Sequence, residues 1–406
     1  MSLAPETLGD TTDASSFLHL NPPFRAEHVG SLLRSASLLE RRAQFQTSAC
    51  TAEELRAAED AAIADAVKLQ QGAFYEGIFE QFSGMSNIVR PIETFKAYLP
   101  YVQFFIYAGF KEVPSIYCTG KIQWPEGGVH LRDFEYLKSL VQPQDIKKLK
   151  VTVCGPTWMH LRHGSDNTYD TAVYKTDDAY FADLVQAYRE ELRALYASGC
   201  RNIQFDDPTF AFFCADSTVE GMKKAGVNWE KLLDTYIRVY NDILQDRPGD
   251  LTVCLHTCRG NYKVRAARTS PAPLGLHYCE GGYDRIAQKF FNELKVDCYY
   301  LEYDTERAGD LEPLKYLPQN KIVVLGLVTT KKGQLETVEE LRDAINEAAD
   351  LIAQGNFKRS RAYALNQICI SPQCGFASVA EGNPITEEEQ RAKLALVVEA
   401  AKKILE

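Results

Sequence analysis

Four side chains that bind metals well lie at the ends of short apolar runs. His256 and Cys258 close the run LTVCLHTC, and Glu302 closes CYYLE. Cys374 follows NQICISPQ. Residues two apart on an extended segment point to the same side, so we expect His256 and Cys258 to face one way. One imidazole, two thiolates and one carboxylate suit tetrahedral zinc, although the spacing alone more often reflects core packing around a satisfied histidine.

These side chains meet only if the apolar runs are parallel strands of one sheet. The runs alternate with helical patterns in units of about 40–50 residues, which favours right-handed strand–helix–strand crossovers. The expected strands are Arg25–Gly30, Lys148–Cys154, Asn202–Asp206, Leu251–Thr257, Asp297–Tyr303, Lys321–Val328 and Ala364–Ile370. The expected helices are Thr51–Gln71, Ala179–Ser198, Trp229–Gln245, Tyr283–Leu294, Thr337–Gln354 and Thr386–Leu405.

The fold class that this alternation predicts is α/β, of the (β/α)8 TIM-barrel type. In such a barrel all strands end at one rim, where ligands far apart in sequence converge. Only seven good strands are found, so one barrel strand is missing or replaced. The alternative is an open doubly wound sheet, but no glycine-rich fingerprint follows any strand.

We expect a flexible tail over 1–23 and a single barrel domain over 24–406. The stretch 72–147 is irregular, rich in aromatic residues and proline, and only Ser115–Lys121 in it is strand-like. It has the character of an insertion into the barrel, suited to cover the barrel mouth.

Composition narrows the class of partner. A net charge of −10 disfavours binding to nucleic acid or to an anionic membrane surface, and leaves small molecules as the expected partners. The N-terminus lacks the basic start and apolar run of a secretory signal, and no apolar stretch reaches the roughly 20 residues that span a bilayer. Eleven cysteines without a CxxC pair fit a reducing cytoplasm, where the thiols are free or metal-bound.

Five short motifs occur together in one order: HVGSL, FDDP, HTC, LEYD and SPQCG. In combination they resemble the C-terminal catalytic barrel of cobalamin-independent methionine synthase, and most of all its single-barrel fungal and bacterial relatives. The similarity runs from Phe24 to the end of the chain. The resemblance implies a Zn²⁺ ion bound by His256, Cys258, Glu302 and Cys374.

The resemblance also implies how substrate binds. Val29, Gly30 and Ser31 match the stretch that holds the amino-acid end of a homocysteine-like thiol, and Asp206 matches the acid that grips its amino group. Without the family, Asp206 is equally a strand-end carboxylate that caps a loop. A free thiol has a pKa of about 8.5, so zinc is needed to present it as a thiolate that accepts a methyl group. Glu302 would be the ligand that substrate sulfur displaces.

The sequence departs from the family at several points. The strand that ends in a TDGE-like motif is absent, and Glu76 or Glu80 would have to replace its carboxylate. The loop GLVTTKKG lacks the histidine that protonates the folate nitrogen; Lys331 is a candidate acid there, or simply a solvated charge. Phe212 stands where a carboxylate contacts folate, and 263–278 is an extra loop.

Three functions therefore stay open. The first is a methyltransferase of methionine biosynthesis that moves a methyl group from methyltetrahydrofolate or another donor to homocysteine. The second is a zinc-dependent alkyl transferase that acts on another thiol or electrophile. The third is a catalytically silent zinc-binding barrel, which would retain zinc but show no dependence on thiols.

Overall fold

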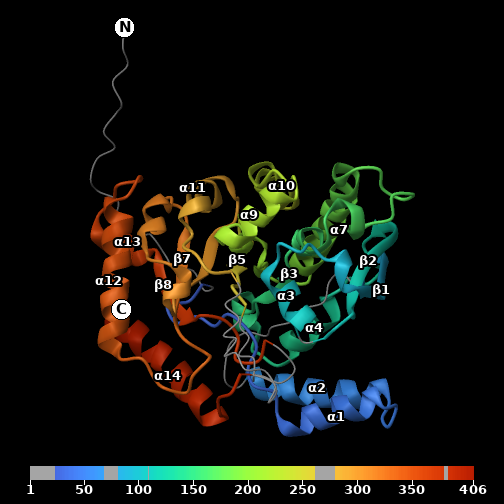
Figure 1. Ribbon diagram of the computed structural model, residues 1–406. Helices are drawn as coiled ribbons and strands as arrows, with labels where there is room; N and C mark the ends of the chain where they lie inside the picture. Colours follow the sequence, from blue (N-terminus) through green and yellow to red (C-terminus); the bar gives the residue numbers. More distant parts are fainter. Residues whose placement is uncertain (1–22, 68–80, 108, 261–278, 379–382) are drawn as a thin grey trace.

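A computed structural model describes residues 23–67, 81–107, 109–260, 279–378 and 383–406. Its centre is a sheet of six parallel strands in the order β3-β4-β5-β6-β7-β8, so each strand pairs with the next along the chain. Long helices lie around the sheet (Figure 1). This arrangement confirms the predicted α/β class with a parallel sheet. The strands are β3 (Val151–Cys154), β4 (Asn202–Asp206), β5 (Thr252–Thr257), β6 (Cys298–Glu302), β7 (Ile322–Val328) and β8 (Ile368–Pro372).

The six long helices expected from the sequence are present, and the sequence marks where they begin. Thr337 and Thr386 form capping boxes with the glutamate three residues later, and Thr51 does the same with Glu54. These helices are α2 (Ala52–Val67), α7 (Asp177–Ala197), α10 (Trp229–Ile243), α11 (Asp284–Glu293), α12 (Val338–Gln354) and α14 (Glu387–Ile404).

Several shorter elements were not predicted from the sequence. The α-helices are α1 (Ala36–Gln46), α3 (Pro100–Tyr107), α4 (Leu131–Ser139), α5 (Trp158–His163), α6 (Ser165–Thr168), α8 (Thr209–Phe212), α9 (Asp216–Lys224) and α13 (Arg361–Asn366). The 3-10 helices are η3 (Ile92–Thr94), η4 (Pro143–Lys148), η5 (Glu306–Ala308) and η6 (Glu312–Tyr316).

Three predicted strands differ in the structure. The run Lys148–Cys154 is a strand only from Val151 onward, because η4 runs to Lys148. The run Arg25–Gly30 is not a strand; only Ala26 pairs with β8, in an isolated parallel bridge to Ile370. The chain then leaves the sheet, so the ladder stops after one bridge. The first part of Ala364–Ile370 is also wrong, because α13 runs to Asn366 and β8 begins two residues later.

The sheet is not closed by backbone pairing within the described residues. β3 forms one edge, and the bridge at Ala26 lies at the other. Lys150, just before β3, reaches across this gap: its Nζ lies 2.5 Å from Glu27 Oε2 and 2.8 Å from the His28 carbonyl. The hydroxyl of Tyr300 also donates to Glu27. Side chains thus connect the two edges where an eight-stranded barrel would have its second strand.

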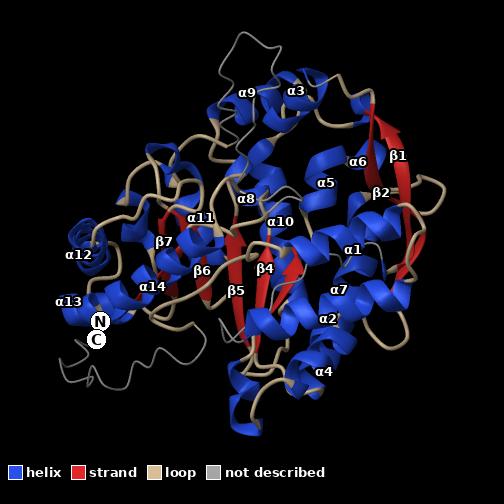
Figure 2. Cartoon of the chain, turned by 90° about the horizontal axis from the view of Figure 1, so that it is seen from below, coloured by secondary structure: helices blue, strands red, loops and turns tan. Residues whose placement is uncertain are grey.

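The stretch after α2 contains an antiparallel hairpin, separate from the main sheet. Its strands are β1 (Ser83–Pro91) and β2 (Glu112–Gln123), and β2 includes the predicted strand Ser115–Lys121. The hairpin packs along α7 at the edge of the molecule (Figures 1 and 2), where the Ile122 amide donates to Tyr174 Oη at 2.8 Å. In the segment that connects β1 to β2, Tyr98 packs against Gly221 of α9.

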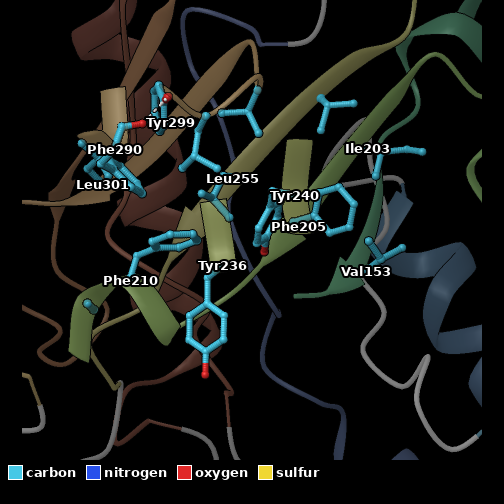
Figure 3. Packing of buried hydrophobic residues seen from close by; sticks show 14 of the residues in the cluster. Val153, Ile203, Phe205, Phe210, Tyr236, Tyr240, Leu255, Phe290, Tyr299 and Leu301 are labelled. Atoms are coloured by element: carbon cyan, nitrogen blue, oxygen red, sulfur yellow. Dashed lines mark hydrogen bonds between the residues drawn. The ribbon is translucent and has the colours of Figure 1, made fainter. Parts of the chain in front are cut away.

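The core follows the alternation of the strands. Outward-facing side chains pack under the helices, as Figure 3 shows for Phe205 against Tyr240 of α10 and Tyr299 against Phe290 of α11. A smaller inner cluster consists of Val29, Cys254, Cys298, Tyr300, Val324 and Cys369. All eleven cysteines are free thiols. No helix in the described part of the chain is both long and apolar enough to cross a bilayer.

Candidate metal centre

The four candidate ligands meet in space. His256, Cys258, Glu302 and Cys374 each offer a donor atom, and these atoms lie within 4.8 Å of one another. The two sulfur atoms are 3.5 Å apart. Three of the residues are buried, and Cys258 is half-buried. Among the described residues no other set of three or more such side chains comes together in this way.

The strands account for this convergence. His256 lies on β5 and Cys258 directly after it, and both donor atoms reach the same group, as the extended spacing requires. Glu302 ends the neighbouring strand β6. Cys374 arrives from the chain after β8, which passes very close to Gly326 of β7: a side chain there would place its first carbon 2.7 Å from Gln373 Cα. Glycine at 326 is therefore what lets this turn approach.

The donor set fits a divalent cation. His256 Nδ1 faces the Tyr300 carbonyl at 3.2 Å, which leaves its buried Nε2 without a hydrogen-bond partner. Burial alone lowers the pKa of His256, but the neighbouring Cys258 sulfur and the Asp206 and Glu302 carboxylates outweigh it and raise the pKa to about 9. The site thus favours positive charge strongly, and its nitrogen, sulfur and oxygen donors are those that zinc prefers.

Glu302 is held by two further contacts. One oxygen accepts from the Arg259 amide at 2.7 Å, and the other accepts from Arg307 Nη2 at 2.8 Å. Arg307 also donates to the carbonyls of Arg259 and Gly260, at 3.2 and 2.8 Å. Arg307 therefore ties the end of β6 to the chain that follows Cys258. The sequence analysis missed this arginine, because nothing in its local pattern indicates a carboxylate partner.

Asp206 lies beside the donor group. It pairs in register with His256 across β4 and β5, and its side chain is only 8% exposed. Gln204, which the sequence analysis also missed, donates to Asp206 Oδ1 at 2.7 Å and to the Val29 carbonyl at 2.9 Å. One amide side chain therefore links two of the predicted substrate-binding residues. The period of two along β4 is the signal that would have found it.

The second aspartate of FDDP has a different role. Asp207 is fully buried and accepts hydrogen bonds from the hydroxyls of Thr157 and Tyr240, both at 2.7 Å, and from the Thr209 amide at 2.9 Å. Burial raises the pKa of Asp207 in spite of these donors. Its contacts join β4 to α10 and to the loop after β3, so Asp207 positions the strand end that carries Asp206.

The predicted substrate segment lies against the turn that carries Cys374. The Phe376 amide donates to the Ser31 carbonyl at 2.6 Å, and the Ala377 amide donates to Ser31 Oγ at 3.2 Å. Gly30 faces Gly375 so closely that a Cβ at 30 would lie 2.6 Å from the Gly375 nitrogen. Val29, Gly30 and Ser31 are thus adjacent to a candidate metal ligand.

We expect Gly30→Ala to disturb this contact. The added methyl group meets backbone rather than a flexible side chain, so the Gly375 turn must shift, at a cost of about 1–3 kcal/mol in stability. Urea unfolding and bound zinc per chain measure the two consequences, and zinc should be held less tightly. Gly249→Ala is the control, because a Cβ there meets no atom within 4 Å. Equal behaviour of the two variants would contradict the prediction.

The remaining predicted residues have different surroundings. Lys331 donates to Asp304 at 3.0 Å, two residues beyond Glu302, and its role as an acid stays a prediction. Phe212 is buried and stacks on Trp158, with ring centroids 5.6 Å apart. Glu76, Glu80 and the loop 263–278 lie outside the described residues.

Known proteins resemble this chain over most of its length. The family described as "Cobalamin-independent synthase, Catalytic domain" matches residues 266–403. Two Bacillus subtilis (strain 168) proteins, uncharacterized protein YxjH and uncharacterized protein YxjG, are each 33% identical to this chain. YxjH aligns over 384 residues, 93% of this chain and 94% of its own length. YxjG aligns over 395 residues, 96% of this chain and 97% of its own length.

Two solved structures also resemble this chain. A putative vitamin-B12 independent methionine synthase from Listeria monocytogenes superposes with a TM-score of 0.67 at 26% identity, covering 94% of this chain and 98% of that one. A B12-independent methionine synthase from Shewanella sp. W3-18-1, solved in complex with selenomethionine, shares the fold with a TM-score of 0.58 at 17% identity, covering 88% and 90%. Aligned over almost its whole length with these relatives, the chain belongs to the family of cobalamin-independent methionine synthase catalytic domains.

Proposed function

We propose that this protein is a zinc-dependent methyltransferase that methylates an amino-acid thiol of the homocysteine type to give methionine. The observation that carries the proposal is the convergence of one imidazole, two thiols and one carboxylate from β5, β6 and the turn after β8. Family membership adds the reaction class, and methyltetrahydrofolate or a related compound is the proposed donor. The boundaries of the barrel domain, 24–406, are part of the same proposal.

In this proposal His256, Cys258, Glu302 and Cys374 hold the ion. Bound zinc supplies one thing: it lowers the pKa of a coordinated thiol, so that the sulfur is a nucleophile at neutral pH. The protein's own contribution is placement. A nucleophile and a methyl group held in line react far faster than the same groups free in solution.

Asp206 and the segment 29–31 are the proposed contacts for the amino-acid end of the thiol. Asp206 carries a negative charge at the rim, fixed by Gln204, and suits an ammonium group. The substrate carboxylate would meet the backbone of Gly30 and Ser31, next to Cys374. A substrate whose ammonium and carboxylate groups are both held in this way would have its sulfur, at the other end, directed to the four metal-binding side chains.

One observation favours a second candidate, an alkyl transferase that uses another thiol or electrophile. The ring of Phe212 stacks on Trp158 at the position where the family resemblance places a folate-contacting carboxylate. Lys331, the candidate acid, is paired with Asp304. Both features suit a donor that needs neither a carboxylate contact nor protonation of a leaving nitrogen.

The test is homocysteine binding and methylation by the zinc-loaded protein, compared with Asp206→Asn. The variant removes the charge but keeps the shape of the side chain, so we expect zinc to stay. Homocysteine affinity should fall roughly 10- to 100-fold, because a hydrogen bond to a charged group contributes about 1.5–3 kcal/mol. Calorimetric titration measures the affinity, and methionine formation from several methyl donors measures the reaction.

The alternatives have separate outcomes. Binding of homocysteine without methylation by folate donors, but with methylation by another methyl compound, would favour the second candidate. Zinc without any thiol binding would identify a silent zinc-binding barrel and contradict the proposal. Unchanged homocysteine affinity in Asp206→Asn would remove Asp206 from the substrate site.

A further inference from the structure

Glu302 and Arg307 form a buried ion pair inside the candidate metal centre. The side chain of Glu302 is fully buried, and that of Arg307 is 8% exposed. Arg307 lies on η5, whose backbone is fixed: the Gly281 amide donates to the Arg307 carbonyl at 3.0 Å. Gly309 packs so tightly on Gly282 that a Cβ at 309 would lie 2.5 Å from the Gly282 Cα. The guanidinium is therefore held in place independently of Glu302.

The second nitrogen of Arg307 gives further support. Nη1 donates to the carbonyls of Arg259 and Gly260, while Nη2 donates to Glu302. One guanidinium nitrogen, Nη1, is thus bound to backbone carbonyls, and the other, Nη2, is bound to the carboxylate. A change in the position of Glu302 leaves the anchored arm where it is.

Charge balance shows what this arrangement does. With zinc bound, two thiolates and Glu302 would carry one more negative charge than the ion carries positive charge. Arg307, in direct contact with Glu302, offsets it, and the buried Arg259 guanidinium is a second positive charge nearby. If substrate sulfur replaces Glu302 as a ligand, the carboxylate stays behind in a buried place. An unpaired buried carboxylate is very unfavourable, so the exchange requires a cation already at hand.

We propose that Arg307 is a positioning residue that receives Glu302 when the substrate thiol displaces it. This inference rests on the proposed function. With zinc held by His256, Cys258 and Cys374, the substrate sulfur would take the place of the Glu302 oxygen, and the thiol proton would pass to water. Glu302 would stay paired with Arg307, which makes its departure from the metal reversible.

The test uses the full chain loaded with zinc or with cobalt(II), and homocysteine as the probe. Arg307→Met removes the cation, so Glu302 is expected to stay on the metal. Metal affinity should be kept, whereas the dissociation constant for homocysteine should rise about 10- to 100-fold, the range expected when a hydrogen bond to a charged group is lost. Sulfur-to-cobalt charge-transfer absorption reports thiol coordination without any turnover.

Two further variants and a control sharpen the result. Arg307→Lys keeps the charge and should recover part of the homocysteine affinity. Arg307→Gln keeps hydrogen bonding to the carbonyls without the charge, should weaken binding like Arg307→Met, and replaces it if that variant does not fold. Arg247→Met is the matched control: it breaks an ion pair with Asp297, at the opposite end of β6.

Each possible outcome either supports or overturns the inference. Weak thiol binding with retained metal, in the neutral variants only, supports the inference. Loss of metal in Arg307→Met and Arg307→Gln would show a purely structural role and overturn it. Unchanged thiol affinity would overturn it too, while the proposed function stood. A parent protein that binds no metal or no thiol would instead defeat the proposed function, and the inference with it.

Discussion

Serine in place of Cys258 or Cys374 is expected to remove zinc from the protein. Zinc held by four protein ligands has an apparent binding free energy of about 10–16 kcal/mol, so the loss of one thiolate costs roughly 3 kcal/mol or more, about 100-fold in affinity. Both cysteines lie in the donor group, with their sulfur atoms 3.5 Å apart. Bound zinc per chain, measured after dialysis against a chelator, should fall from about one to a small fraction.

Cys154 provides the matched control. It is also a cysteine at the end of a strand, β3, and is half-buried like Cys258, but it lies outside the donor group. Cys154→Ser should therefore keep its zinc. Retention of zinc by Cys258→Ser and Cys374→Ser alike would show that the metal, if any, is bound elsewhere, and would remove the central observation behind the proposed function.

Lys150→Met should be among the most destabilising single changes outside the metal centre. The substitution leaves the buried Glu27 carboxyl without the amine that lies 2.5 Å from it. Breaking a buried ion pair by removing one partner costs about 3–5 kcal/mol. The midpoint and slope of urea unfolding measure the change, and the loss should be far larger than for a surface pair such as Lys403 and Glu399.

A second substitution separates charge from packing. Glu27→Gln in the Lys150→Met background removes the unpaired charge, so much of the lost stability should return. Failure to recover would mean that the ammonium group acts through its contacts with the His28 carbonyl and Tyr300 Oη rather than through Glu27. Normal stability of Lys150→Met would contradict the idea that side chains hold the two edges of the sheet together.

The sequence was sufficient where the signal is local and repeated. The strands β4, β5, β6 and β7 lie within one residue of their predicted bounds, because runs buried on both faces are apolar throughout. Alternation along β5 directed His256 and Cys258 to one side. Parallel pairing then brought Glu302 to the same rim.

Other features depend on contacts that no local pattern reports. The run Arg25–Gly30 has the composition of a strand, but only Ala26 pairs with β8. Arg307 and Gln204 acquire their roles only when β4, β5 and β6 are side by side. The resemblance to the family supplied the proposed ligand set as a whole, whereas the ion pair of Glu302 with Arg307 is visible only in the folded structure.

The wide separation of the two parts of the site in the sequence has a consequence for how the protein folds. All four metal donors come from β5 onward, where each strand pairs with the next along the chain. The segment that carries Gly30 is fastened to the far end of the sheet, for example by Arg25 to the Leu365 carbonyl, 340 residues away. Closing so long a loop costs about 5 kcal/mol of chain entropy and waits for synthesis of the last strand. Cys374 itself follows β8, so both the metal donors and the thiol pocket would be completed only after the last strand has been synthesised.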